Sequence, residues 1–161
     1  ACRVSKHPVS ANHTGAQALF DHPRLKSDDE IRAIADTGGI VGVFAIPFFM
    51  SLEPEVGIDL LLDHIDHIAN LVGWQHVGIG SDFPHVAPKA VLADVFDAKT
   101  VELLGFRPEH NLKPTQNFVG FDDYGEYVNF SRGLVKRGYG DEQVSGILGG
   151  NYLRVFEQVC G

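Results

Sequence analysis

Two polar residues that could carry chemistry stand where predicted buried strands end. Asp82 follows the small apolar segment VGIGS, and His13 follows the segment PVSAN at residues 8–12. In α/β proteins with parallel strands, the carboxyl ends of the strands hold the reacting groups. Histidine is the commonest metal ligand, and a nearby aspartate can bind a metal, orient another group or transfer a proton. A structural role is the alternative, because an aspartate at a strand end frequently caps the next element.

The elements that must position these residues alternate between strands and helices. The sequence predicts strands within residues 4–13, 40–46 and 76–81. A capping box, SDDE at residues 27–30, starts a helix that Gly38-Gly39 ends. Apolar residues three and four apart predict a second helix over residues 58–72. We therefore expect parallel strands joined by helical crossovers, which is an α/β fold.

The second half of the chain is predicted to be irregular at first and then helical. Residues 84–121 contain four of the eight prolines and leave room for a short helix near 90–104. A loop of this length after a strand end is usually functional, so we expect an active-site loop. Further helices are predicted over residues 122–137, 141–148 and 150–159.

The composition narrows the classes of protein to consider. The length of 161 residues suits one domain, and a net charge of −8 without a Lys/Arg cluster argues against nucleic-acid binding. No apolar run approaches the roughly 20 residues that span a bilayer, and no signal peptide is visible. The compartment therefore stays open between cytoplasm and periplasm. Cys2 and Cys160 are too few for a disulfide framework or a zinc ribbon.

Three segments of the chain share their motifs, in the same order, with one known family. They read NHTGAQALFDHPRLKSDDEIRAIADTGGIVGV at residues 12–43, DHIDHIANLVGWQHVGIGSDF at 63–83 and RGYGDEQVSGILGGNYLRVFEQV at 137–159. Together they resemble the membrane (renal) dipeptidase family of zinc peptidases. The resemblance extends from about residue 8 to 159, and residues 86–120 match least.

The resemblance implies a (β/α)8 barrel with two zinc ions at its carboxyl-terminal face. It also implies the hydrolysis of dipeptides, including those with a C-terminal D-residue. By position, His13 matches a ligand of one zinc ion, and Arg24 matches the arginine whose planar fork holds the substrate carboxylate. Asp82 matches the aspartate that accepts and passes on the proton of the metal-bridging water.

The resemblance covers only the carboxyl-terminal part of such a barrel. Three strands are predicted where eight are needed. The family's H-x-D zinc pair has no counterpart at the start of the chain, and neither Glu53 nor Glu55 stands at a predicted strand end as a bridging glutamate would. We therefore expect the chain to be the carboxyl-terminal portion of one barrel, completed by an N-terminal half. We expect that half to be a cleaved piece of the same enzyme, with a separately encoded subunit or a truncated gene as alternatives. The completed barrel is expected to form a homo-oligomer.

Several positions depart from the family pattern near the expected site. Asn12 and Thr14 replace serines around the zinc histidine, Leu25 replaces an asparagine, and Pro84-His85 replaces Asp-Gly. These changes bear on substrate preference more than on the reaction. His85 is either a contact for substrate or metal, or an exposed loop residue. The alternative function is a non-catalytic or degenerate subunit that keeps the fold for assembly or binding.

Other residues admit a chemical or a structural role. His64 and His67 stand beside two aspartates on the predicted 58–72 helix, as in a metal-binding face. A solvated polar face is favoured, because the apolar residues occupy the other side of this helix. His22 is predicted to order the loop that carries Arg24, and Phe48-Phe49 are predicted to line the substrate cleft.

Overall fold

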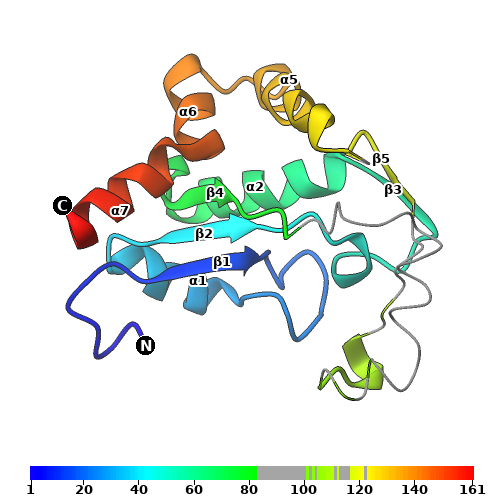
Figure 1. Ribbon diagram of the computed structural model, residues 1–161, viewed down its shortest axis with the longest axis horizontal. Helices are drawn as coiled ribbons and strands as arrows, with labels where there is room; N and C mark the ends of the chain where they lie inside the picture. Colours follow the sequence, from blue (N-terminus) through cyan, green and yellow to red (C-terminus); the bar gives the residue numbers. More distant parts are fainter. Residues whose placement is uncertain (83–100, 102, 104, 111, 113–116, 122) are drawn as a thin grey trace.

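A three-stranded parallel sheet forms the centre of the computed structural model (Figure 1). Its strands are β1 (Ser10–Thr14), β2 (Ile40–Val43) and β4 (Val77–Ile79), in the order β1-β2-β4. The three predicted strands are thus confirmed, and they are parallel as expected. The structure describes residues 1–82, 101, 103, 105–110, 112, 117–121 and 123–161.

Two helices supply the predicted crossovers. α1 (Asp28–Asp36) starts at the predicted capping box, in which the N–H of Glu30 donates to the Ser27 hydroxyl and the N–H of Ser27 donates to the Glu30 carboxylate. α2 (Asp59–Val72) ends at Gly73, whose φ of 94° is a conformation that favours glycine. Both helices are confirmed where the sequence predicts them.

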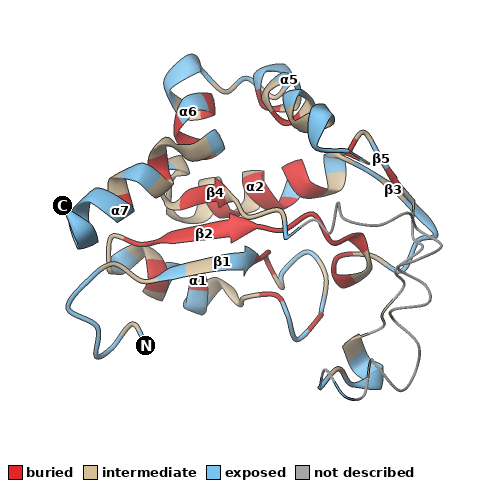
Figure 2. Ribbon diagram, viewed as in Figure 1, coloured by how far each residue is buried: buried red, intermediate tan, exposed pale blue. Residues whose placement is uncertain are grey.

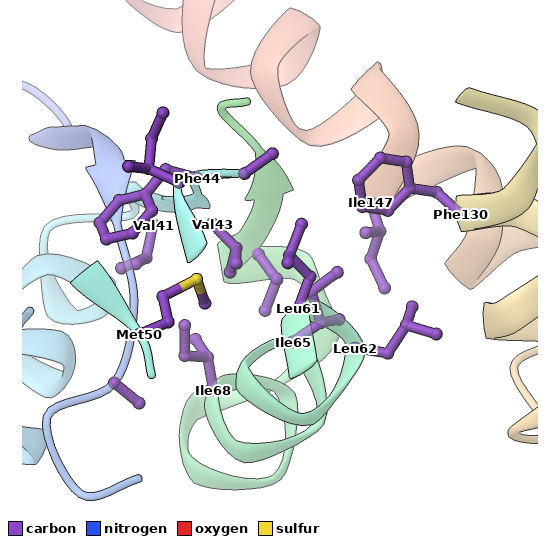
Figure 3. Close-up of a cluster of buried hydrophobic side chains, with 14 of the residues drawn as sticks. Val41, Val43, Phe44, Met50, Leu61, Leu62, Ile65, Ile68, Phe130 and Ile147 are labelled. Carbon is purple, nitrogen blue, oxygen red and sulfur yellow. The ribbon is translucent and has the colours of Figure 1, made fainter. Parts of the chain in front are cut away.

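The hydrophobic core lies between the sheet and α2. Leu61, Ile65 and Ile68 of α2 are fully buried, and they share one cluster with Val41 and Val43 of β2 (Figure 3). Burial of side chains of this size stabilises the fold by about 1.5–3 kcal/mol each. All four residues of β2 are buried, whereas most of β1 is exposed (Figure 2). The middle strand therefore fixes the sheet, and β1 lies at its accessible edge.

The other face of the sheet is lined by glycine and approached by the last helix, α7 (Asn151–Cys160). Because side chains alternate along a strand, Gly42 points away from α2. A Cβ at Gly42 would collide with the Tyr152 phenol and with the carbonyl oxygen of Asn12. A Cβ at Gly80 would collide with the same carbonyl. The small residues of these strands therefore allow β1 and α7 to approach closely.

α7 is anchored at the amino ends of the strands, opposite the expected site. The Asn151 amide donates to the carbonyl oxygens of Trp74 and Val77, both at 2.8 Å. Arg154 donates to backbone carbonyls that precede β2 and β4. Three apolar side chains of this helix remain exposed: Leu153, Phe156 and Val159.

The carboxyl-terminal helices differ in part from the prediction. The helix predicted over residues 122–137 is shorter, because α5 (Val128–Lys136) follows a 3-10 turn at Tyr124–Tyr127. α6 (Asp141–Ser145) and α7 are separated by a kink at Gly149 within the π-helical turn Gly146–Gly150, so the two helices predicted over residues 141–148 and 150–159 are confirmed. The backbone of Gly149 is not helical (φ 167°, ψ −27°), and the first helical segment ends there.

A second parallel sheet, absent from the sequence prediction, pairs β3 (Glu55–Gly57) with β5 (Asn117–Val119). Strands of three residues are too short to show a periodic pattern, and their partners are distant in sequence. The helix predicted near 90–104 lies almost entirely outside the described residues, as does much of the predicted loop 84–121. In the described part of the chain, no helix has the length and apolar character needed to cross a membrane.

Candidate active site

The carboxyl ends of the three strands meet at one edge of the sheet. Backbone hydrogen bonds continue past the ends of the strands and hold the chain there. Phe44, directly after β2, donates its N–H to the carbonyl of Thr14 on β1 (2.9 Å). Ala45 donates its N–H to the carbonyl of Ser81, beyond β4 (2.7 Å). His13 and Asp82, the two residues predicted at strand ends, therefore lie at the same edge of the sheet, on either side of β2.

The predicted metal ligand, His13, is exposed near the end of β1. The register of β1 against β2 shifts between Ala11 and Thr14, so the strand is irregular at this point. An irregularity of this kind re-aims side chains, and it is frequent next to active sites. Thr14, the following residue, is buried. His13 is thus exposed to solvent beside a buried neighbour.

The predicted proton-transfer residue, Asp82, follows β4 and is exposed. Its φ of 49° lies in the left-handed region, which residues other than glycine seldom adopt. Strained backbone of this kind gathers at functional sites, where the surrounding structure maintains it. Asp82 thus has an unusual backbone conformation just after a strand end, and its role in proton transfer stays a prediction. The neighbouring His85 lies outside the described residues.

Arg24 is held near this edge by its backbone. Its carbonyl accepts a hydrogen bond from the Thr14 hydroxyl (2.8 Å), and its N–H donates to Nδ1 of His22 (3.2 Å). The guanidinium lies over the ring of Phe49, 5.4 Å from the centroid. It forms no ion pair with any residue in the part of the chain that the structure describes. An arginine supported in this way can bind a carboxylate through both of its terminal nitrogens.

His22 orders the Arg24 loop, as the sequence predicts. It is buried, its ring lies 5.0 Å from that of Phe49, and its Nε2–H donates to the carbonyl of His110 (3.1 Å). Because Nδ1 accepts from Arg24, the ring must be neutral for both bonds to form. Burial lowers the pKa of His22 and favours that neutral form. His22 thus ties the Arg24 loop to the 3-10 turn Pro108–His110.

The two phenylalanines predicted to line the cleft differ in exposure. Phe49 is buried beneath Arg24, and Phe48 is half-buried with its ring edge-on to Phe49, at 4.6 Å between centroids. Phe49 therefore supports the guanidinium, while Phe48 keeps an accessible surface. Phe48 stays the candidate for a substrate contact.

The described residues do not form a metal site by themselves. No group of three or more His, Cys, Asp or Glu among them could hold a metal ion. The exposed imidazole of His13 fits the role of one ligand, whereas a zinc centre takes three or four from the protein. Two zinc ions therefore cannot be assigned to the described residues alone, and the expectation of further strands stays a prediction.

The polar residues of α2 form the solvated face that the sequence favours only in part. His64 is completely buried, and its Nδ1 accepts a hydrogen bond from the N–H of Ala16 (2.9 Å). His67 lies with Nε2 2.8 Å from the carboxylate of Asp28 on α1. The prediction was wrong for His64, because the loop after β1 also covers the helix there, whereas Asp63 is exposed as predicted. A periodic pattern assigns only one side of a helix to the core.

The aspartates of α2 form an ion cluster with Arg137, directly after α5. The guanidinium lies 2.9, 2.7 and 2.5 Å from the carboxylates of Asp59, Asp63 and Asp66. Tyr139 donates its hydroxyl to Asp66 (2.7 Å). The residues whose spacing resembled a metal-binding face therefore join α2 to the α5–α6 connection.

Parallel strands, helical crossovers and polar residues gathered at the carboxyl ends of the strands are the architecture of (β/α) barrel enzymes. The family described as membrane dipeptidase, peptidase family M19, matches residues 1–104 and 114–160. The chain belongs to the membrane dipeptidase family.

Curated relatives are similar along nearly all of this chain. An uncharacterized dipeptidase of Schizosaccharomyces pombe is 30% identical over 98% of the chain and 32% of its own length. The dipeptidase tcpJ of Claviceps purpurea is 28% identical over 99% of the chain and 31% of its own length. The chain therefore spans about a third of the length of these relatives.

Solved structures of similar fold extend the comparison. An amidohydrolase from Pseudomonas aeruginosa is 31% identical, with a TM-score of 0.81 over 98% of this chain and 47% of that one. A metallopeptidase from Rhodobacter sphaeroides, liganded with a phosphinate mimic of the dipeptide L-Ala-D-Ala, is 21% identical, with a TM-score of 0.72 over 98% and 38%. The expected α/β class is confirmed by these likenesses.

Two residues that contact the Arg24 loop were not predicted from the sequence. Thr14 was noted only as a departure from the family pattern, yet it joins β1 to Arg24. His110 had no sequence context, and it contacts His22 through its backbone, which no side-chain pattern reveals. The one available signal was the position of Thr14 next to His13.

Proposed function

We propose that this chain supplies the carboxyl-terminal strands of a metal-dependent dipeptidase, with His13, Arg24 and Asp82 as its share of the active site. The observation that carries the proposal is the placement of His13 and Asp82 at one edge of a parallel sheet, in a chain of the membrane dipeptidase family. The names of the relatives support dipeptides as the substrate class.

Arg24 binds the C-terminal carboxylate of the dipeptide in this proposal. Its backbone is fixed by Thr14 and His22, and its guanidinium rests on Phe49. A fixed guanidinium orients a substrate with little loss of freedom on binding, which contributes to catalysis through positioning. A peptide without a free carboxylate would lose this contact.

Asp82 moves the proton in the hydrolysis. It accepts a proton from the attacking water and gives it to the nitrogen of the leaving amine as the peptide bond breaks. The carboxylate is exposed at the edge to which His13 belongs, and its strained backbone supports a dedicated orientation.

His13 is one ligand of the metal centre in this proposal, and the remaining ligands come from the rest of the barrel. Two zinc ions in the complete site are the proposed cofactor, in keeping with the metallopeptidase named among the structures of similar fold. The substrates to be tested include dipeptides with a C-terminal D-residue.

The partner of this chain is an N-terminal half of the barrel, whether in one polypeptide or as a separate chain. Three observations support this partner. The chain spans about a third of its curated relatives. β1 and β4 are the flanking strands of the described three-stranded sheet. α7 exposes Leu153, Phe156 and Val159, which a further layer would cover. We further propose that the completed barrel forms a homo-oligomer.

The test is to measure zinc content, intact mass and initial rates on the native assembled protein, with L-Ala-L-Ala and L-Ala-D-Ala as substrates. The proposal expects about two zinc ions per assembly and turnover that a chelator abolishes. His13→Ala should lower both the zinc content and the rate, whereas the control His7→Ala, at an exposed position, should change neither. An assembled protein without zinc and without turnover would instead be the non-catalytic subunit.

A further inference from the structure

His64 is a completely buried histidine that the proposed reaction does not use. It lies on α2, in the motif DHIDH at residues 63–67. Its one hydrogen bond in the described structure is to the N–H of Ala16, 48 residues away in sequence, at 2.9 Å. That contact reaches the loop that connects β1 to α1.

The hydrogen bond defines the state of the ring. Nδ1 accepts from Ala16, so the hydrogen of the neutral ring is on Nε2. Nε2 is buried and has no partner among the described residues. An apolar side chain of similar size would fill this space without burying an unpaired N–H, which is unfavourable. The bond to Ala16 is therefore what a histidine contributes at this position.

Ala16 lies at the neck of the loop of residues 15–26, which carries Arg24. The neck is closed by two backbone bonds, from Lys26 N–H to the Gly15 carbonyl (2.9 Å) and from Gln17 N–H to the Lys26 carbonyl (2.8 Å). The imidazole of His64 packs directly against it, since a Cβ on Gly15 would lie 2.9 Å from Nδ1.

The same loop is tied to the metal-ligand end of β1. The Thr14 hydroxyl, next to His13 in the strand, donates to the carbonyl of Arg24 at 2.8 Å. His64 therefore fixes one side of a short unit whose other members place His13 and Arg24 relative to each other. A displacement of about 1 Å at such a unit is enough to weaken catalysis strongly.

We propose that His64 is a positioning residue. Through the neck of the 15–26 loop, it keeps Arg24 in a fixed position relative to His13. The inference rests on the proposed dipeptidase function for its effect on substrate, and on the geometry alone for its effect on the loop. Burial, followed by the nearby His67, lowers the pKa of His64 to about 4. The ring consequently stays neutral and able to accept at the pH of an ordinary assay.

The experiment compares His64→Asn with His64→Leu in the complete assembled protein. Asparagine offers an oxygen close to the place of Nδ1, whereas leucine fills the volume and accepts nothing. His67→Leu is the matched control, because it removes the other histidine of the motif, whose partner is Asp28 on α1. The readouts are amide hydrogen exchange of residues 15–26 and the KM and kcat for a dipeptide and its C-terminal amide.

The proposal expects His64→Leu to lose exchange protection in residues 15–26 and to raise KM for the free dipeptide by about tenfold. The KM for the amide, which lacks the carboxylate that Arg24 binds, should change by less than about threefold. His64→Asn and His67→Leu should keep the protection and KM of the parent protein. Should His64→Leu fail to fold, His64→Gln replaces it, because its oxygen reaches the place of Nε2 instead.

Unchanged exchange in residues 15–26 of the leucine variant, or equal losses on dipeptide and amide, would overturn the proposal. So would a His64→Asn variant as impaired as His64→Leu. A parent protein that hydrolyses no dipeptide would reject the proposed function, and the exchange experiment would still decide whether His64 holds the loop.

Discussion

Two regions of the molecule contain histidine and carboxylate side chains, and they use them differently. At the strand edge, His13 and Asp82 are exposed and Arg24 rests on an aromatic ring. Along α2, His64 is buried, and each aspartate of the DHIDH motif binds Arg137. By spacing alone, α2 is the denser metal-binding pattern. The partners of the α2 residues indicate a structural cluster there, which the spacing alone did not, and the strand edge stays the predicted chemical site.

The largest expected effect is the loss of turnover in Asp82→Asn. The asparagine amide cannot accept the proton of the attacking water, so kcat should fall by about 10²–10⁴-fold. Zinc content and thermal stability should stay close to those of the parent protein. Steady-state kinetics and metal analysis measure both. Asp36→Asn, at an exposed position on α1, is the control. Full activity of Asp82→Asn would show that Asp82 takes no part in the proton transfer.

The buried region should respond to pH through His64. Its pKa falls from 6.5 to about 4 on folding, so the unfolded chain binds the proton more readily. The stabilisation is complete above pH 6.5 and is lost as the pH falls to about 4, a loss of about 3 kcal/mol. Urea unfolding at pH 7, 5.5 and 4 measures it. His64→Asn should show a shallower dependence, and an identical dependence would contradict the assignment.

Arg24→Ala tests whether the exposed guanidinium binds the C-terminal carboxylate of the substrate. We expect kcat/KM for a dipeptide to fall by about 10²-fold, because the loss of a charge-assisted bidentate contact is worth roughly 2–3 kcal/mol. The amide analogue should be affected much less. Arg32→Ala, which removes a surface arginine paired with Asp29, serves as the control. Equal losses on both substrates would reject the carboxylate contact.

Arg137→Ala addresses the ion cluster and should act on stability instead of activity. The guanidinium side chain is 21% exposed and contacts three carboxylates, which would repel one another without it. Because the carboxylates are partly solvated, we expect a loss of about 2 kcal/mol in the free energy of unfolding. Chemical denaturation measures it, with kcat as the companion readout. A loss of kcat in a variant of normal stability would show that Arg137 serves the reaction, and the two regions would then not differ in role.

His67→Ala should have the smallest effect. Its contact with Asp28 is partly exposed, with side-chain exposures of 24% and 34%, so the pair contributes less than about 1 kcal/mol. The same denaturation experiment detects it. A loss as large as that of Arg137→Ala would show that exposure is a poor guide within this cluster.

Much of the fold could be predicted because it depends on local patterns. The apolar run of β2, the capping box of α1 and the spacing of α2 each correspond to an element in the structure. The pair β3 and β5 could not be predicted, since each strand has three residues and its partner is distant in the chain. Gly149 and Gly150 predicted a break between two helices, and the structure has non-helical backbone at Gly149.

For the candidate site, the sequence predicted a histidine and an aspartate at strand ends, and its resemblance to the family added the arginine of the loop after β1; their roles stay predictions. Only the tertiary structure decided what holds them. Thr14 and His64 act through hydrogen bonds between their side chains and the backbone of other residues, and such bonds leave no side-chain pattern, whereas the role of His22 was predicted. The tertiary structure also decided that the polar stripe of α2 is buried or paired. A helical pattern records the spacing of side chains along one element, whereas burial and pairing depend on the elements that pack around it.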